Sequence, residues 1–235
     1  MPLSRRQRVI LGEMGIPVWV RRDAPPVSLE PAANPPIERP AAEVEVRDVA
    51  GLGWEDLRAR VAACMACAEL ASQRTQTVFG VGDPAADWLF IGEAPGAEED
   101  RRGEPFVGPA GQLLDNMLAA LALQRGRNVH IANILKCRPP GNRDPKPEEA
   151  EACRGFLDRQ ITLIRPRVIV ALGRVAAQSL LGSNEPLGQL RVREHAYRGT
   201  PLVVTYHPAY LLRSPGEKAK VWSDLLRARS LVAGA

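Results

Sequence analysis

The chain has 235 residues, of which 45% are hydrophobic and 25% are charged, and its formal net charge is +4. The hydrophobic content suffices for a packed core, but the apolar runs are shorter than the roughly 18–20 residues of a membrane-spanning helix, so we expect no membrane segment. Arginine supplies most of the positive charge, which favours a polyanionic partner, although a solvated basic surface explains the charge equally well.

The first 50 residues are predicted to form a flexible N-terminal extension. Residues 1–23 carry several arginines and an apolar stretch with a tryptophan, and they lack the apolar core and cleavage site of a secretory signal, so we expect a cytoplasmic protein. This segment resembles the clamp-loader-binding peptide of the replicative polymerase psi subunit, which implies a replication or clamp-loader partner; a flap that docks on its own domain is the alternative. Residues 24–50 hold six prolines and six alanines, a composition typical of a linker.

The remaining residues, 51–235, are predicted to form one α/β domain. Apolar residues at helical spacing predict helices over residues 54–70, 110–123, 147–164, 174–181 and 218–231. Short apolar runs predict strands over residues 87–91, 129–135, 168–172 and 201–206. Because strands alternate with helices, we predict a three-layer α/β/α sandwich around a central, mainly parallel four-stranded sheet.

The chain contains four cysteines, which is the number that a site with four thiolate ligands requires. They are Cys64, Cys67, Cys137 and Cys153. One tetrahedral zinc ion or one iron–sulfur cluster takes four thiolates, and in a reducing cytoplasm cysteine clusters usually bind metal. Two disulfides are the alternative, and the spacing leaves zinc and an iron–sulfur cluster both open.

Polar and glycine-rich segments follow the predicted strands. Gly92-Glu-Ala-Pro-Gly96 follows the first strand, Asn133 lies in the second, and His207 follows the fourth. The carboxyl ends of parallel strands meet at one edge of a sheet, so we expect Phe106, Asn133 and His207 to border one pocket. An aromatic ring stacks on a base, an amide reads its edge and an imidazole donates to a carbonyl oxygen, which predicts a pocket for a planar heterocycle.

These motifs together resemble family 4 uracil-DNA glycosylases, the iron–sulfur branch of the uracil-DNA glycosylase superfamily. The resemblance covers about residues 52–232 and rests on the four cysteines and on residues 92–96, 103–114, 133–140 and 207–213. It implies a monomeric DNA repair enzyme that flips uracil out of DNA, hydrolyses its N-glycosidic bond and leaves an abasic site without cutting the strand. The four cysteines would hold a [4Fe-4S] cluster, with zinc as the alternative.

The resemblance also implies roles for individual residues. Phe106 would stack on the uracil, Asn133 would pair with its O4/N3 edge, and His207 would donate to O2 as negative charge builds there. Glu99 would crowd C5, where thymine carries a methyl group. The rest of the pocket lining would come from Gly92, Glu93 and Ala94.

The source of the attacking water's activation stays open at the sequence level. Ala94 stands where well-known relatives carry an Asp that activates water. Glu93 and Asp100 are the two candidate bases, and a mostly dissociative reaction with a weakly activated water is the alternative.

Four further residues are predicted to contact DNA. Leu211 and Leu212 follow the catalytic histidine and are candidates for an apolar wedge that fills the gap left by the flipped base. Arg213 and Lys136 are predicted to meet backbone phosphates.

Two other functions remain as alternatives. One is a broader deaminated-base glycosylase that removes hypoxanthine as well as uracil, as the sister family 5 does. The other is a non-catalytic iron–sulfur module that binds DNA or the replication machinery.

Overall fold

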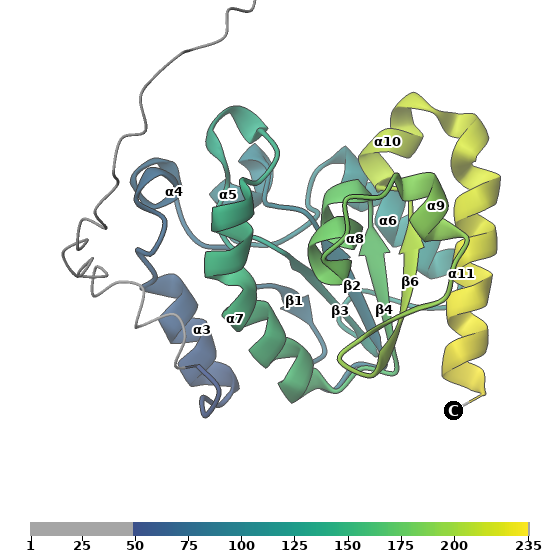
Figure 1. Cartoon of the computed structure of the whole chain (residues 1–235), viewed down its shortest axis with the longest axis horizontal. Helices are drawn as coiled ribbons and strands as arrows, with labels where there is room; N and C mark the ends of the chain where they lie inside the picture. The colour runs from purple at the N-terminus through teal and green to yellow at the C-terminus, as the bar shows by residue number, and fades with distance from the viewer. Residues whose placement is uncertain (1–48, 235) are drawn as a thin grey trace, which may run out of the picture. The chain divides into compact units, whose positions relative to one another are not determined.

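A six-stranded mixed sheet organises residues 49–234, the part of the chain that the computed structural model describes (Figure 1). The strands are β1 (Val81–Gly82), β2 (Trp88–Gly92), β3 (Val129–Asn133), β4 (Val168–Leu172), β5 (His195–Tyr197) and β6 (Thr200–Thr205). Their order is β1-β3-β2-β4-β6-β5; the four central strands are parallel, and both edge strands pair antiparallel to their neighbours. The predicted N-terminal peptide and almost all of the predicted linker lie outside the described residues.

The α/β sandwich is confirmed, with one correction to the sheet. The four predicted strands form its parallel centre, but the sheet has six strands, because the short β1 and β5 extend its two edges. The central strands β2, β3 and β4 are buried at every residue. That burial explains their continuous apolar sequence, since helices cover both faces of the sheet.

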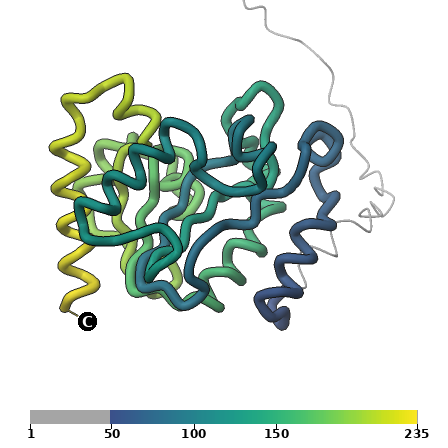
Figure 2. Tube along the Cα trace, turned by 180° about the vertical axis from the view of Figure 1, so that it is seen from behind, coloured from purple at the N-terminus to yellow at the C-terminus, as the bar shows by residue number. Residues whose placement is uncertain are grey.

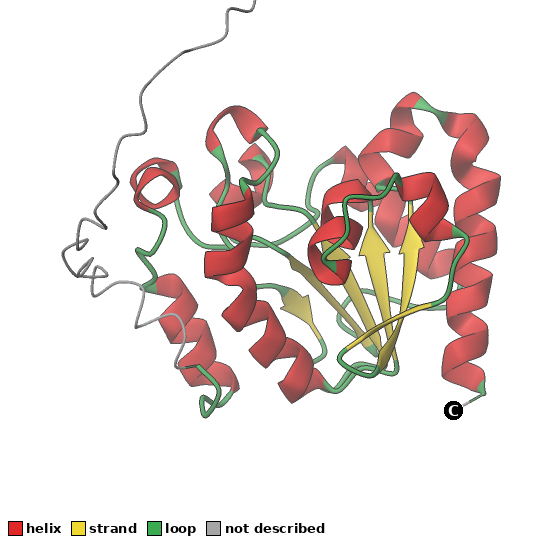
Figure 3. Cartoon of the chain, viewed as in Figure 1, coloured by secondary structure: helices red, strands yellow, loops and turns green. Residues whose placement is uncertain are grey.

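Helices form the two outer layers (Figures 1 and 3). They are α3 (Trp54–Ala62), α4 (Ala68–Gln73), α5 (Ala97–Arg102), α6 (Pro109–Ala120), α7 (Pro147–Ile164), α8 (Arg174–Leu181), α9 (Leu187–Arg191), α10 (Pro208–Arg213) and α11 (Lys218–Ala233), with short 3-10 turns at Pro140–Asn142 and Pro215–Glu217. Apolar side chains of α7, α8 and α9 pack on one face of the sheet, and those of α6, α10 and α11 pack on the other. The view from behind shows the α6 and α11 side (Figure 2). No helix within residues 49–234 has both the length and the apolarity needed to cross a bilayer.

The prediction of a single helix over residues 54–70 is wrong, because a non-helical segment separates α3 from α4. Residues 63–67 are non-helical, and Cys67 is the extended N-cap of α4, with φ −105° and ψ 92°. The break turns the first two cysteines toward α7, where a third apolar cluster includes Leu57, Leu70, Cys137, Cys153 and Phe156. The cysteine pair therefore lies in a turn between two short helices.

Candidate active site and cysteine cluster

Phe106, Asn133 and His207 meet at the carboxyl edge of the central strands, as the sequence predicts. The ring centroids of Phe106 and His207 lie 5.5 Å apart with the planes inclined by 28°. Gly92 ends β2 opposite Asn133 in β3. A Cβ at Gly92 would lie 2.6 Å from Phe106 Cζ and 2.5 Å from Asn133 Oδ1, so both side chains crowd onto its bare backbone.

The Phe106 ring is held by an unusual backbone conformation. Its φ of 55° lies in the left-handed region, which a bulky residue rarely adopts. Arg125 fixes the turn by donating from Nη1 to the Pro105 carbonyl at 2.8 Å and from Nη2 to the Phe106 carbonyl at 2.9 Å. Gly111 in α6 also packs directly on that carbonyl, where a Cβ would clash at 1.7 Å. Sequence reasoning missed Arg125, which stabilises a turn 20 residues before it in the chain.

His207 is half-buried, and one hydrogen bond defines the tautomer of its neutral imidazole. It is the N-cap of α10, and its Nδ1 accepts a hydrogen bond from the Ala209 backbone N–H at 3.1 Å. The proton of the neutral ring is therefore on Nε2, which can act as a donor. Burial, and secondarily the charge of Arg213, lowers the pKa of His207 to about 4, against an opposing effect of Glu99.

Asn133 offers an unused hydrogen-bonding group at the same place. Its side chain is 2% exposed, and its Oδ1 has no hydrogen-bond partner within the described residues. Buried polar atoms are almost always paired. The free amide oxygen, beside the Phe106 ring, therefore points to a bound polar ligand.

Glu99 connects two loops of the pocket instead of standing free in solvent. Its Oε2 accepts from the Gly96 backbone N–H at 3.1 Å, and its Oε1 accepts from the N–H groups of Val107 at 3.1 Å and Gly108 at 3.4 Å. These bonds cap α5 and join the Gly92–Gly96 loop to the segment that carries Phe106.

The two candidate bases differ in their surroundings. Burial raises the pKa of Glu93 to about 7, helped by the charge of Asp144 and opposed by that of Arg174. Asp100 is 3% exposed, and its carboxylate accepts the backbone N–H groups of Thr75 at 3.0 Å and Gln76 at 3.4 Å. Asp100 thus anchors the segment before β1, and its oxygens are already engaged.

Two of the four predicted DNA contacts are wrong. Lys136 is 1% exposed and its Nζ donates to the Asn133 carbonyl at 3.0 Å and to Gln160 Oε1 at 2.6 Å, so it cannot reach a phosphate. Leu211 is 1% exposed and packs into the core between α6 and α11. Leu212 and Arg213 are exposed, and so is Tyr210, which sequence reasoning missed.

The four cysteines belong to one apolar cluster between α3, α4 and α7, and all four thiols are free. Cys137 and Cys153 are buried, and burial raises the pKa of Cys153 to about 12. The Lys136 backbone N–H donates to Cys153 Sγ at 3.4 Å. Within residues 49–234, no three Cys, His, Asp or Glu side chains converge as closely as the ligands of one metal ion do.

Replacing Gly92 with alanine is expected to lower the rate of the reaction in this pocket by about tenfold or more. A displaced side chain that raises the activation free energy by about 1.4 kcal/mol already lowers the rate tenfold. The added Cβ has to displace Asn133 and Phe106 together. The measurement is the single-turnover rate of the reaction that this pocket catalyses. Gly188→Ala is the control, since a Cβ there meets nothing within 4 Å, and equal rates for both variants would contradict the crowding.

Comparison with known proteins agrees with this geometry. The uracil DNA glycosylase superfamily model matches residues 79–226. A type-4 uracil-DNA glycosylase from Archaeoglobus fulgidus is 43% identical over 185 residues, which are 75% of this chain and 92% of that protein. One from Thermotoga maritima is 42% identical over 177 residues, or 74% and 91%. A type-5 enzyme from Thermus thermophilus is 35% identical over 153 residues, or 55% and 68%. The chain therefore belongs to the uracil-DNA glycosylase superfamily and, within it, to the type-4 family.

Proposed function

We propose that this protein is a monofunctional uracil-DNA glycosylase that removes uracil from DNA and leaves an abasic site. The observation that carries the proposal is the unpaired, buried amide oxygen of Asn133 beside the stacked rings of Phe106 and His207. A flipped uracil offers a planar face for Phe106 and a polar edge for Asn133.

His207 stabilises the leaving group in this mechanism. As the bond between N1 of uracil and C1′ of the sugar breaks, its electron pair moves into the ring and negative charge develops on O2. The Nε2–H of neutral His207 donates to that oxygen, and one such donor in a dry site supplies about 3–4 kcal/mol. Water adds to C1′ as this bond breaks and gives a proton to the base assigned below, and the uracil anion takes a proton from solvent.

Asn133 and Glu99 select the base. Asn133 pairs with the O4/N3 edge of uracil, and cytosine fails there because its amino group reverses the donor and acceptor pattern. Glu99 restricts the space at C5, which excludes the methyl group of thymine. Its three backbone hydrogen bonds support this role, because they hold the carboxylate in a fixed place. Gly92 completes the lining, and Ala94 contributes at most its backbone, because its side chain packs against the apolar cluster that holds the cysteines.

We propose that Glu93 is the base that takes a proton from the attacking water. Asp100 does not take this role in the proposal, because backbone N–H groups occupy its oxygens. Glu93 directly follows Gly92 in the chain, and its raised pKa suits a base that works near neutral pH.

The excision rate is expected to rise about tenfold per pH unit below pH 7 and to level off above it, because Glu93 accepts a proton only when ionised and its pKa is about 7. His207, with a pKa of about 4, stays neutral over this range and adds no inflection. Glu93→Gln is expected to be slow and independent of pH, measured as kcat/KM between pH 5.5 and 9. A Glu93→Gln profile that retains the inflection would refute this assignment and favour the dissociative alternative.

We also propose that Cys64, Cys67, Cys137 and Cys153 hold a [4Fe-4S] cluster. The four thiols share one apolar cluster, and a backbone N–H to a sulfur, as at Cys153, is a common feature of iron–sulfur sites. Such a cluster can hold protein segments together or carry one electron.

DNA would approach over α10. Its exposed residues Leu212 and Arg213 remain the proposed wedge and phosphate contact, and Lys136 and Leu211 are dropped from the proposal. The replication partner for residues 1–23, the monomeric state and the reducing cytoplasm stay predictions.

The function is tested with oligonucleotides that carry U:G, U:A, single-stranded uracil or hypoxanthine, followed by alkaline cleavage of abasic sites. Uracil release without alkali-independent strand cleavage is expected. Release of hypoxanthine as well as uracil would favour the broader glycosylase. DNA binding with no base release would favour the non-catalytic module.

A further inference from the structure

Arg74 is a charged residue that the proposed uracil chemistry does not use, and it contacts the cysteine cluster directly. It is the C-cap of α4, the short helix whose N-cap is Cys67. Its Nη1 donates to Cys137 Sγ at 2.9 Å, and its Nη2 donates to the Cys64 carbonyl at 2.6 Å. One guanidinium therefore joins the first cysteine segment to the third cysteine.

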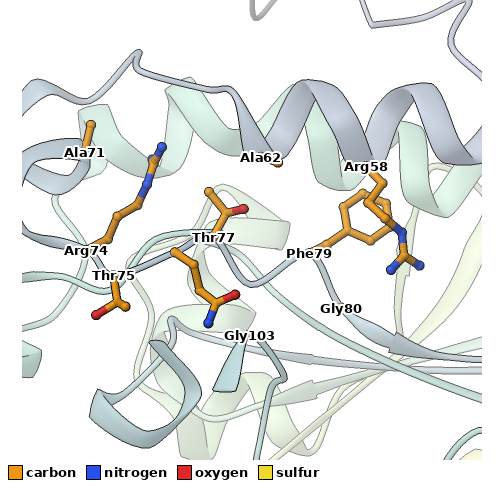
Figure 4. A pocket seen from close by; sticks show the side chains of 10 residues that line it. Arg58, Ala62, Ala71, Arg74, Thr75, Thr77, Phe79, Gly80 and Gly103 are labelled. Carbon is orange, nitrogen blue, oxygen red and sulfur yellow. The ribbon is translucent and has the colours of Figure 1, made fainter. Parts of the chain in front are cut away.

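The other side of Arg74 borders a cavity of about 520 Å³. The lining includes Arg58, Thr75, Thr77 and Phe79, and Figure 4 shows Arg74 and Arg58 on opposite sides of Thr77. Both Nη atoms of Arg74 are engaged with the cysteine segments, so its forked end faces the sulfur and its stem forms part of the cavity wall. Arg74 thus borders the cavity and also contacts the Cys137 sulfur.

Arg58 lines the same cavity without a contact of this kind. Its guanidinium lies 5.1 Å from the centroid of the Phe79 ring, and its Nε is 3.9 Å from Glu55. Two arginines therefore line one cavity, and within residues 49–234 only Arg74 of the two donates a hydrogen bond to a cysteine sulfur.

We propose that Arg74 raises the reduction potential of the [4Fe-4S] cluster and shields it from solvent and dioxygen on the cavity side. The inference rests on the cluster proposed above. Adding an electron makes the cluster more negative, and a charge-assisted N–H···S bond to a ligand sulfur stabilises the more negative state. The same contact closes the cavity over Cys137, so its removal exposes the sulfur.

The test compares wild type, Arg74→Gln, Arg74→Lys and Arg58→Gln as anaerobically purified full-length proteins. We measure iron and sulfide content, the midpoint potential by protein-film voltammetry, and the rate at which the absorbance at about 400 nm is lost in air. We expect a lower potential and several-fold faster bleaching for Arg74→Gln, smaller effects for Arg74→Lys, and wild-type values for Arg58→Gln. Uracil excision under anaerobic conditions is expected to stay at the wild-type rate in all three variants.

Two results would overturn the proposal: a wild-type potential in Arg74→Gln, or an equal shift in Arg58→Gln, which would assign the effect to charge in the cavity. If Arg74→Gln does not retain iron, the Arg74→Lys variant tests the proposal instead, because it keeps the charge but loses the forked contact. A wild-type potential in Arg74→Lys also overturns the proposal. Wild-type protein without iron would instead refute the cluster itself, which separates the two failures.

Discussion

Replacing His207 with alanine is expected to slow uracil release by about 10²- to 10³-fold, the loss typical of one oxyanion donor. The variant retains Phe106 and Asn133, so the base can still enter the pocket. The variant loses the Nε2–H that we propose meets the developing charge on O2, and water in its place has no fixed orientation. We therefore expect a large fall in kcat with a small change in KM, measured in single-turnover and steady-state assays.

The helix cap needs a separate control, because His207 Nδ1 also accepts from Ala209 N–H at the start of α10. Losing a cap costs about 1 kcal/mol of stability. His207→Asn can keep the cap with a shorter side chain that does not reach O2, so it should be as slow as alanine with a nearly wild-type melting temperature. His195→Ala is the matched control, since that ring bonds the Leu190 carbonyl and lies in the edge strand β5. A His207→Asn variant with wild-type rate would remove the imidazole from the mechanism.

The pocket could be predicted from the sequence because its residues follow buried strands. Trp88–Gly92 and Val129–Asn133 are continuous apolar runs that fix two parallel neighbours, and the loops after such strands have to meet at one edge. The roles of Asn133 and His207 depended on that topology and on the family resemblance. Only the folded structure shows that the Asn133 amide oxygen is unpaired and that a hydrogen bond fixes the tautomer of His207.

The direction of individual side chains could not be predicted. Leu211 and Leu212 are neighbours of one residue type, and the packing of α10 against α6 and α11 decides which one is buried. Lys136 has the charge of a phosphate contact, but its ammonium turns inward to the Asn133 carbonyl and Gln160. Arg74 lies 63 residues from Cys137 in sequence, so no local pattern marks their contact.

Replacing Cys153 with alanine is expected to abolish cluster binding and to destabilise the region around α3, α4 and α7 more than an ordinary core truncation does. Cys153 is buried in α7 within the apolar cluster that also holds the other three cysteines. A small cavity there costs about 1–2 kcal/mol by itself. Losing the cluster adds the binding free energy that links these segments, because metal binding and folding are coupled. The measurements are iron content, the absorbance band near about 400 nm and the melting temperature.

Val61→Ala separates cluster loss from cavity formation, since Val61 is fully buried in α3 and belongs to the same apolar cluster. That variant should retain its iron and lose about 1–3 kcal/mol of stability, because it removes core methyl groups but no ligand. Cys153→Ala should retain none of the intact cluster and melt at a clearly lower temperature. The type of metal is decided in the wild-type protein: a brown sample with about four irons per chain fits the cluster, and a colourless one with a single zinc ion fits the alternative. If Cys153→Ala kept its iron and matched Val61→Ala in stability, Cys153 would be an ordinary core residue, and the four-thiolate site between α3, α4 and α7 would lose the ligand contributed by α7.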